Sequence, residues 1–255
     1  MATNVTHSLR LAVQFLTRLP VAGCPVADGR ALGYSLLWYP AVGLLIAAIV
    51  TVTAVLSLAV LPTMIAATLT LIVWVAVTGA LHLDGLGDCA DAWVGAHGRE
   101  EPREATLKIL KDPRCGVMAV VAITLALLLK FSLIITMIGH DLLAHLWLAP
   151  VLSRTMVLSL FLVTRYVNAH GLGAELADQL PRHHATKVFA ASWLATLIFV
   201  PVALWLLLAV TSALILFGLR HLTLARLGGF TGDGAGALIE IQELAIMLSI
   251  VAYWL

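Results

Sequence analysis

The sequence predicts an all-α integral membrane protein, a polytopic bundle of about seven transmembrane helices forming a single domain over residues 1–255. Of the 255 residues, 61% are hydrophobic and only 11% are charged. A soluble domain is about half apolar and about one quarter charged. So few charges cannot cover a surface that faces water, whereas a bilayer solvates such a chain.

Apolar runs of spanning length, separated by short polar segments, are the second observation. A helix needs about 20 apolar residues to cross the hydrocarbon layer. The run 188–219 would extend roughly 48 Å as one helix, against a core of about 30 Å. Pro201 within it therefore predicts a break between two short spans. The predicted spans are 36–61, 63–81, 116–138, 142–163, the two halves of 188–219, and 235–255, after an amphipathic surface helix over 9–19.

The placement of Lys and Arg is the third observation. The connections near Pro62, at 139–141 and at Pro201 contain neither residue type. The positive-inside rule then places the N-terminus and the polar segments in the cytoplasm, and the C-terminus outside. We expect a multi-pass protein of the cytoplasmic (inner) membrane, with lipids as neighbours and no nucleic acid partner. Whether it forms a homo-oligomer stays open. The predicted cytoplasmic site segments are 82–115, 165–187 and 220–235.

Three carboxylates in the first polar segment predict a metal site. Asp84, Asp88 and Asp91 have the spacing i, i+4, i+7, which places them within about 60° on one helical face. Carboxylates this close repel unless a cation lies between them. Oxygen ligands without a Cys or His pair suit Mg²⁺ or Mn²⁺, and magnesium in turn suggests phosphoryl chemistry. The plain alternative is the solvated acidic end of a helix.

Further candidates flank these acids. His82 could act as a base only if the helix starts after it, because a continuous helix would turn it away from the three Asp. Pro102 and the residues up to Lys111 predict a short amphipathic helix. The segment Lys111-Asp112-Pro113-Arg114 follows, and its cations could neutralise charge on a transferred phosphoryl group. Ordinary positive-inside anchoring is the alternative for them.

The second polar motif covers residues 228–236. Its glycines permit close approach of a ligand or of another helix. Asp233 and Glu240 would share a helical face and could complete a metal cage. Acids inside a spanning helix are costly, which makes function the default expectation for Glu240. The same expectation covers the intramembrane cations Lys130 and Arg154, although Lys130 could snorkel and Arg154 could pair with an acid.

The three cysteines predict neither disulfides nor a zinc site. Cys24, Cys89 and Cys115 are odd in number and widely spaced, with no CxxC pair. We expect free thiols.

The pattern as a whole resembles the cobalamin synthase family, the adenosylcobinamide-GDP ribazoletransferases. Residues 81–91, LHLDGLGDCAD, resemble its LHLDGLADTADG signature. The other family-like segments, in matching order, are 15–20 (FLTRLP), 39–43 (YPAVG), 109–116 (ILKDPRCG), 128–131 (LLKF), 153–154 (SR) and 229–233 (GFTGD). The departures Gly87, Cys89, Ala92 and Trp93, where we expect Ala, Thr, Gly and Leu, remove no carboxylate.

The resemblance implies an Mg²⁺-dependent transferase for the final assembly of cobalamin. It would transfer the phosphocobinamide part of adenosylcobinamide-GDP to α-ribazole or its 5′-phosphate and release GMP. The predicted metal ligands are Asp84, Asp88, Asp91 and Asp233. The predicted catalytic residues are Lys111, Asp112, Arg114 and His82. The predicted substrate-binding residues are Arg18, Lys130, Arg154, Gly232 and Glu240.

Two other readings remain. Lipid phosphotransferases of the CDP-alcohol type also use an Asp-rich helix at the membrane face, but their Asp-Gly-x-x-Ala-Arg motif has an Arg that residues 84–89 lack. A divalent-cation transporter would need acids near the mid-membrane in two symmetric halves, whereas most acids here lie at span ends and no repeat is visible.

Overall fold

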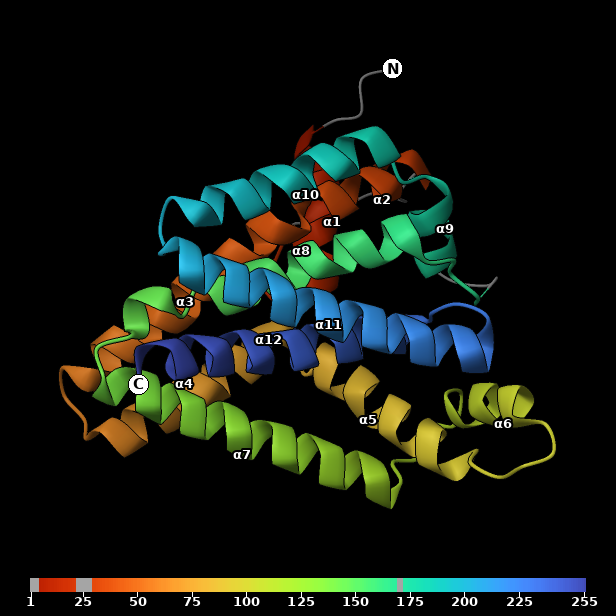
Figure 1. The fold of residues 1–255 in the computed structure, drawn as a ribbon, viewed down its shortest axis with the longest axis horizontal. Coiled ribbons are helices and arrows are strands. Elements are labelled where there is room, and N and C mark those ends of the chain that lie inside the picture. The colour runs from red at the N-terminus through yellow and green to blue at the C-terminus, as the bar shows by residue number, and fades with distance from the viewer. Residues whose placement is uncertain (1–4, 22–28, 169–171) are drawn as a thin grey trace.

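The computed structural model describes residues 5–21, 29–168 and 172–255, and within them the regular secondary structure is helical apart from one isolated bridge. Long helices lie along the long axis of the molecule, and α6 lies at one end beside the end of α5 (Figure 1). The fold class predicted from composition is therefore confirmed as an all-helical bundle with several apolar helices.

Five helical stretches in the described part of the chain are long and apolar enough to span a membrane. They are Gly29–Leu58 (α2, η1 and α3), Val117–Gly139 (α7), Leu143–Val163 (η2 and α8), Val202–Leu227 (α11) and Gly232–Trp254 (α12). Within the first, α2 is Gly29–Ser35, η1 is Leu36–Trp38 and α3 is Tyr39–Leu58. Within the third, η2 is Leu143–His145 and α8 is Leu148–Val163.

The count of seven is not confirmed. Helices α4 (Thr63–Thr78) and α5 (Leu81–Gly95) form a pair bent by 85°, which brings the total to six if they are one broken span. The predicted span after residue 188 falls in α10 (Arg182–Leu197), which has only 16 residues and begins with a polar turn. The predicted break is confirmed, because α10 ends at Leu197 and α11 starts directly after Pro201.

Three short helices complete the described part of the chain: α1 (Val5–Leu16), α6 (Pro102–Ile109) and α9 (Leu172–Asp178). Pro102 occupies the first turn of α6 as predicted, where the missing N–H of proline costs no hydrogen bond. Helix α1 contacts α2 and α3, and α9 contacts α2.

The centre of the bundle is α8. Every residue from Leu148 to Phe161 is buried, and α8 contacts α3, α10, α11 and α12. The outer helices α3, α7 and α11 expose large apolar side chains instead, among them Leu56, Leu125 and Leu214. A chain that exposes such residues along whole helices has a surface suited to lipid, not to water.

The bend between α4 and α5 aims the acidic helix away from α4. Gly79 and Ala80 both have left-handed backbone, with φ of 61° and 57°. The side chain of Arg18 lies against Gly79, where it leaves no room for a Cβ atom, and the Arg18 amide donates to the Val77 carbonyl at 2.7 Å. The FLTRLP segment thus packs on the turn at which α5 begins.

Two of the polar segments are joined by backbone hydrogen bonds. The Phe230 amide donates to the Arg165 carbonyl at 2.9 Å, and the Val167 amide donates to the Phe230 carbonyl at 3.0 Å. This bridge holds the connection after α8 against the turn that precedes α12. It therefore helps to fix the position of Asp233, which lies in the first turn of α12.

Candidate active site

Helix α5 runs through residues 81–95, so the three acids do lie on one continuous helix. They have different surroundings. The Asp91 carboxylate accepts hydrogen bonds from the Gly116 amide at 2.6 Å and the Ala119 amide at 2.9 Å. These are orphan donors at the start of α7, where a negative charge is favourable. Asp91 therefore caps α7, a contact that leaves it less available than Asp84 and Asp88.

Asp233, from α12 (Gly232–Trp254), lies close to Asp84 and Asp88 of α5. The two helices approach closely at Gly85, where a Cβ atom would lie 2.7 Å from the Asp233 carbonyl oxygen. Only glycine permits this approach. Asp88 experiences the repulsion of Asp84, Asp233 and Asp91. We call Asp84, Asp88 and Asp233 the carboxylate cluster.

No basic side chain in the described residues forms an ion pair with the carboxylate cluster. Asp233 accepts a long hydrogen bond from the Thr231 hydroxyl at 3.4 Å, and Thr231 in turn caps α12 by accepting from the Gly234 amide. The cluster thus carries negative charge that the protein itself does not neutralise by pairing.

The donor chemistry of the cluster fits magnesium. Within the described residues, no three His, Cys, Asp or Glu side chains converge closely enough to form a complete cage. Magnesium does not require one, because it usually binds through one or two carboxylates together with water and substrate phosphates. Unpaired carboxylates beside an open cavity supply such an incomplete ligand set.

An outer cavity of about 330 Å³ lies over α5 and contains the predicted cations. Its lining includes Asp84, Asp88 and the whole segment Lys111–Arg114. The structure therefore brings together the acidic and basic motifs that the sequence separates by more than 20 residues. Lys111 is exposed and forms no ion pair with another described residue.

Arg114 and Asp112 pair with each other at the rim of this cavity. The Arg114 Nη2 donates to Asp112 at 2.7 Å and its Nε at 2.9 Å, in a bidentate arrangement. These hydrogen bonds hold the pKa of the partly exposed Asp112 at about 2. Asp112 orients the guanidinium instead of facing the cavity as an unpaired acid.

The intramembrane charges form a separate set that we call the ion network. Lys130 donates to Glu240 at 2.7 Å and to Glu243 at 2.6 Å, and Arg154 pairs with Glu243. All four side chains are buried, and Lys130 also lies 4.9 Å from the centre of the Trp74 ring. Two cations balance two anions, which is how buried charges are tolerated.

None of the ion network lines the outer cavity, so the structure separates Lys130, Arg154 and Glu240 from the carboxylate cluster. Their contact with substrate stays a prediction. Glu243, which contacts both cations, was not among the predicted site residues. Its signal was a second acid one turn after Glu240 in an otherwise apolar helix.

His82 lies between the carboxylate cluster and the ion network. Because α5 begins at Leu81, the helix runs through His82 and turns it into the bundle, where it is 3% exposed. Its Nδ1 lies 3.4 Å from Nη2 of Arg154, and its Nε2 has no partner within the described parts of the chain. The predicted condition for His82 as a base, a helix start after it, is not met.

An inner cavity of about 170 Å³ lies on the other side of Asp84. It is lined by His82, Asp84, Gly232 and Asp233 together with aromatic side chains. Gly232, the first residue of α12, lines this cavity, and its contact with substrate stays a prediction. Asp84 lines both cavities, which makes it the residue common to the outer and inner parts of the site.

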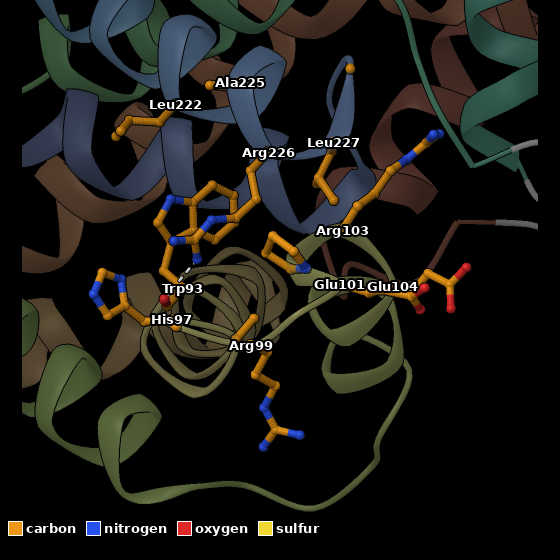
Figure 2. A pocket seen from close by; sticks show the side chains of 14 residues that line it. Trp93, His97, Arg99, Glu101, Arg103, Glu104, Leu222, Ala225, Arg226 and Leu227 are labelled. Carbon is orange, nitrogen blue, oxygen red and sulfur yellow. Dashed lines mark hydrogen bonds between the residues drawn. The ribbon is translucent and has the colours of Figure 1, made fainter.

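A further cavity, about 850 Å³, lies beyond the carboxylate cluster, between the end of α5, the start of α6 and the end of α11. Figure 2 shows Arg226 lying over Trp93, while Arg99 and Arg103 extend outward in different directions. Arg226 donates to the Trp93 carbonyl at 2.6 Å and stacks 5.5 Å from its ring. Sequence reasoning missed this pair, whose only signal was an Arg in the last turn of an apolar helix.

Of the three cysteines, Cys89 is buried, Cys115 is exposed, and both are free thiols. Cys24 lies outside the described residues. The expectation of free thiols is confirmed for the two that the structure describes.

Comparison with known proteins identifies the family. The chain is 44% identical over 246 residues to the adenosylcobinamide-GDP ribazoletransferase of Pseudomonas fluorescens (strain Pf0-1), covering 96% of this chain and 99% of that protein. It is 46% identical to those of Pseudomonas syringae pv. syringae (243 residues; 94% and 97% covered) and Pseudomonas aeruginosa (245 residues; 96% and 97% covered). No solved structure matches. Since the family model for cobalamin-5-phosphate synthase matches residues 8–251, the chain belongs to the cobalamin-5-phosphate synthase family.

Proposed function

We propose that this protein is an adenosylcobinamide-GDP ribazoletransferase, the enzyme that completes cobalamin by joining the lower nucleotide to the corrinoid. It transfers the phosphocobinamide group to α-ribazole or α-ribazole 5′-phosphate and releases GMP. The observation that carries the proposal is the outer cavity, where two unpaired carboxylates face Lys111 and Arg114. The names of the relatives, which cover nearly the whole chain, support it.

The diphosphate of the donor occupies the outer cavity in this proposal. Lys111 and Arg114 contact the phosphate that leaves as GMP and offset the charge that develops on it. Asp112 keeps the Arg114 guanidinium in a fixed orientation through two hydrogen bonds. These residues bind and orient the leaving group.

Asp84, Asp88 and Asp233 would hold Mg²⁺ at this site. A bound divalent ion would supply charge neutralisation for the diphosphate. Asp91, predicted as a fourth ligand, accepts two backbone hydrogen bonds and contributes chiefly by fixing the start of α7 against α5.

The acceptor approaches from the inner cavity. The oxygen of a free ribose hydroxyl of the acceptor forms a bond to the phosphorus that carries the cobinamide, the bond from that phosphorus to the bridging oxygen breaks, and GMP leaves with that oxygen. The proton of the acceptor hydroxyl passes to a base. Of the candidates, Asp84 and Asp233 line the inner cavity as unpaired carboxylates, and His82 lies beside them.

The test is GMP release from adenosylcobinamide-GDP when α-ribazole is added to membranes containing this protein. We expect release with Mg²⁺, loss of release after chelation with EDTA, and recovery when Mg²⁺ is restored. Release of CMP from a CDP-alcohol instead would identify a lipid phosphotransferase. Metal flux into liposomes without phosphotransfer would identify a divalent-cation transporter.

We also propose that the site faces the cytoplasm at the inner membrane, with lipid around the exposed apolar helices. Cys115 offers a direct test because it is exposed beside the outer cavity while Cys89 is buried. In a Cys24→Ser variant, a membrane-impermeant maleimide should label inverted vesicles and spare intact spheroplasts. Labelling of spheroplasts would reverse the orientation.

A further inference from the structure

The inner cavity has walls suited to a flat aromatic group. Phe15 and Tyr39 are stacked on each other with ring centres 6.4 Å apart and 20° between planes. Phe161 and Tyr166 form a second stack at 6.2 Å and 7°. All four residues line the cavity. Aromatic walls favour a planar ring by offset or edge-to-face packing.

The size of the cavity restricts its occupant. Pockets for whole drug-sized ligands hold about 300–1,000 Å³. At about 170 Å³ the inner cavity holds one portion of a ligand, such as a fused-ring base, and excludes a corrinoid. The occupant must also be reached from Asp84, which lines both cavities.

The ion network fixes the hydrogen-bonding character of His82. An Arg guanidinium has only donors, so Nδ1 of His82 must accept from Arg154. A neutral imidazole that accepts at Nδ1 carries its proton at Nε2. That N–H is buried and has no acceptor among the residues that the structure describes, although His82 lines the inner cavity. A buried donor without a partner is costly, and a ligand acceptor in the cavity would satisfy it.

We propose that the inner cavity binds the aromatic base of the acceptor nucleoside, and that the Nε2–H of His82 donates to the unsubstituted ring nitrogen of that base. The inference rests on the proposed function and deepens it. A benzimidazole riboside such as α-ribazole has a planar fused ring and one such ring nitrogen. With the base between the aromatic stacks, its sugar extends towards Asp84 and Asp233, where the donor phosphorus is reached.

His82 is then a binding residue and not the base of the reaction. Because Nε2 already carries a proton, it cannot accept one from the acceptor hydroxyl. The proton goes to a carboxylate of the cluster, of which Asp84 and Asp233 line the same cavity.

The experiment compares His82→Leu with His82→Gln in purified protein, measuring kcat and the KM of each substrate. Leucine removes the donor, and we expect the KM for α-ribazole to rise about tenfold or more while the KM for adenosylcobinamide-GDP is unchanged. Glutamine retains an N–H donor and should stay within about threefold of wild type. A fall in kcat at unchanged acceptor KM in both variants would make His82 a base and overturn the inference.

Gly232→Leu tests the cavity without touching the ion network. A Cβ atom at residue 232 would meet only the Tyr166 hydroxyl at 3.7 Å, so the backbone tolerates a side chain that then enters the cavity. We expect lost binding of α-ribazole, measured by equilibrium dialysis, with retained binding of the donor. Retained acceptor binding would place the base elsewhere.

Trp193→Phe is the matched control. Trp193 also has a buried, unpartnered N–H but does not line the inner cavity, so its removal should leave both KM values unchanged. The dialysis also separates this inference from the proposed function. If wild-type protein binds α-ribazole in the cavity without releasing GMP from adenosylcobinamide-GDP, the function fails and the binding site stands.

Discussion

The carboxylate cluster and the ion network are built on the same helix, α12, yet they treat charge in opposite ways. Asp233 and Glu240 are seven residues apart on α12. Glu240 is buried and paired with Lys130, whereas Asp233 has no cationic partner among the described residues. At 1.5 Å per residue, Glu240 lies about 10 Å further along α12. The comparison suggests that the paired charges of the ion network connect the helices, whereas the unpaired carboxylates of the cluster are available to bind a cation.

The largest effect should come from breaking the ion network at Glu243. Removing one partner of a buried pair leaves an uncompensated charge and costs about 3–5 kcal/mol. Glu243 contacts both Lys130 and Arg154, so we expect Glu243→Gln to lower protein yield and thermal stability in detergent sharply. The double variant Lys130→Met/Glu243→Gln should regain part of that loss. Full stability of Glu243→Gln would show that the network does not hold the bundle.

Removing a carboxylate of the carboxylate cluster should lower activity and leave stability unchanged. Asp84 has repulsive neighbours and no cationic partner among the described residues, so Asp84→Asn should not lower the melting temperature. Its loss from both cavities should reduce kcat for GMP release by about 10²- to 10³-fold, as loss of one electrostatic contact at a reacting group does. Steady-state rates and thermal unfolding of the same preparation measure both. A destabilised Asp84→Asn with normal activity would erase the contrast between the two regions.

Asp91 should behave as a structural acid in the middle of a functional motif. As a cap on α7 it contributes about 0.5–2 kcal/mol. We expect Asp91→Asn to lower thermal stability by that amount and to reduce activity far less than Asp84→Asn. A loss of activity equal to that of Asp84→Asn would return Asp91 to the metal ligands.

The smallest effect is expected at Asp112. The pKa of its carboxyl is lowered from 3.8 to about 2, so the pair with Arg114 is complete above pH 4 and is lost only as the pH falls through about 2. Titration of Asp112 should therefore cause no change in kcat for GMP release between pH 5 and 9. Because the pair lies at the surface, with the Arg114 side chain exposed, Asp112→Asn should not change stability measurably. A change in kcat of wild type over this range that Asp112→Asn removes would contradict this assignment.

Local patterns predicted the elements of this protein well. The register of Asp84, Asp88 and Asp91, the start of α6 at Pro102 and the break at Pro201 all follow from helical periodicity and proline geometry. The span count failed at α10, because hydropathy identified the apolar residues after 188 while the helix itself begins at the polar Arg182.

What the sequence could not supply was pairing between distant residues. Asp91 resembles its two neighbours in spacing, and only the return of the chain 25 residues later gives it a different role. Lys130 and Arg154 were expected to be functional because charge in a membrane is costly. Their partners on α12 lie up to 113 residues away, and no local pattern identifies them.

The capping of α7 by Asp91 closes the segment from Ala92 to Cys115 into a loop, which the hydrogen bond from Arg226 to the Trp93 carbonyl also ties to α11. The chain leaves α5 at this carboxylate and comes back to it at Gly116. Lys111 and Arg114 lie on the returning arm, so their distance from the acids depends on this cap, on the loop length and on the contacts of α6 with α5 and α11. Insertions near Gly98 could therefore retune the reach of the cations while every spanning helix stays in place.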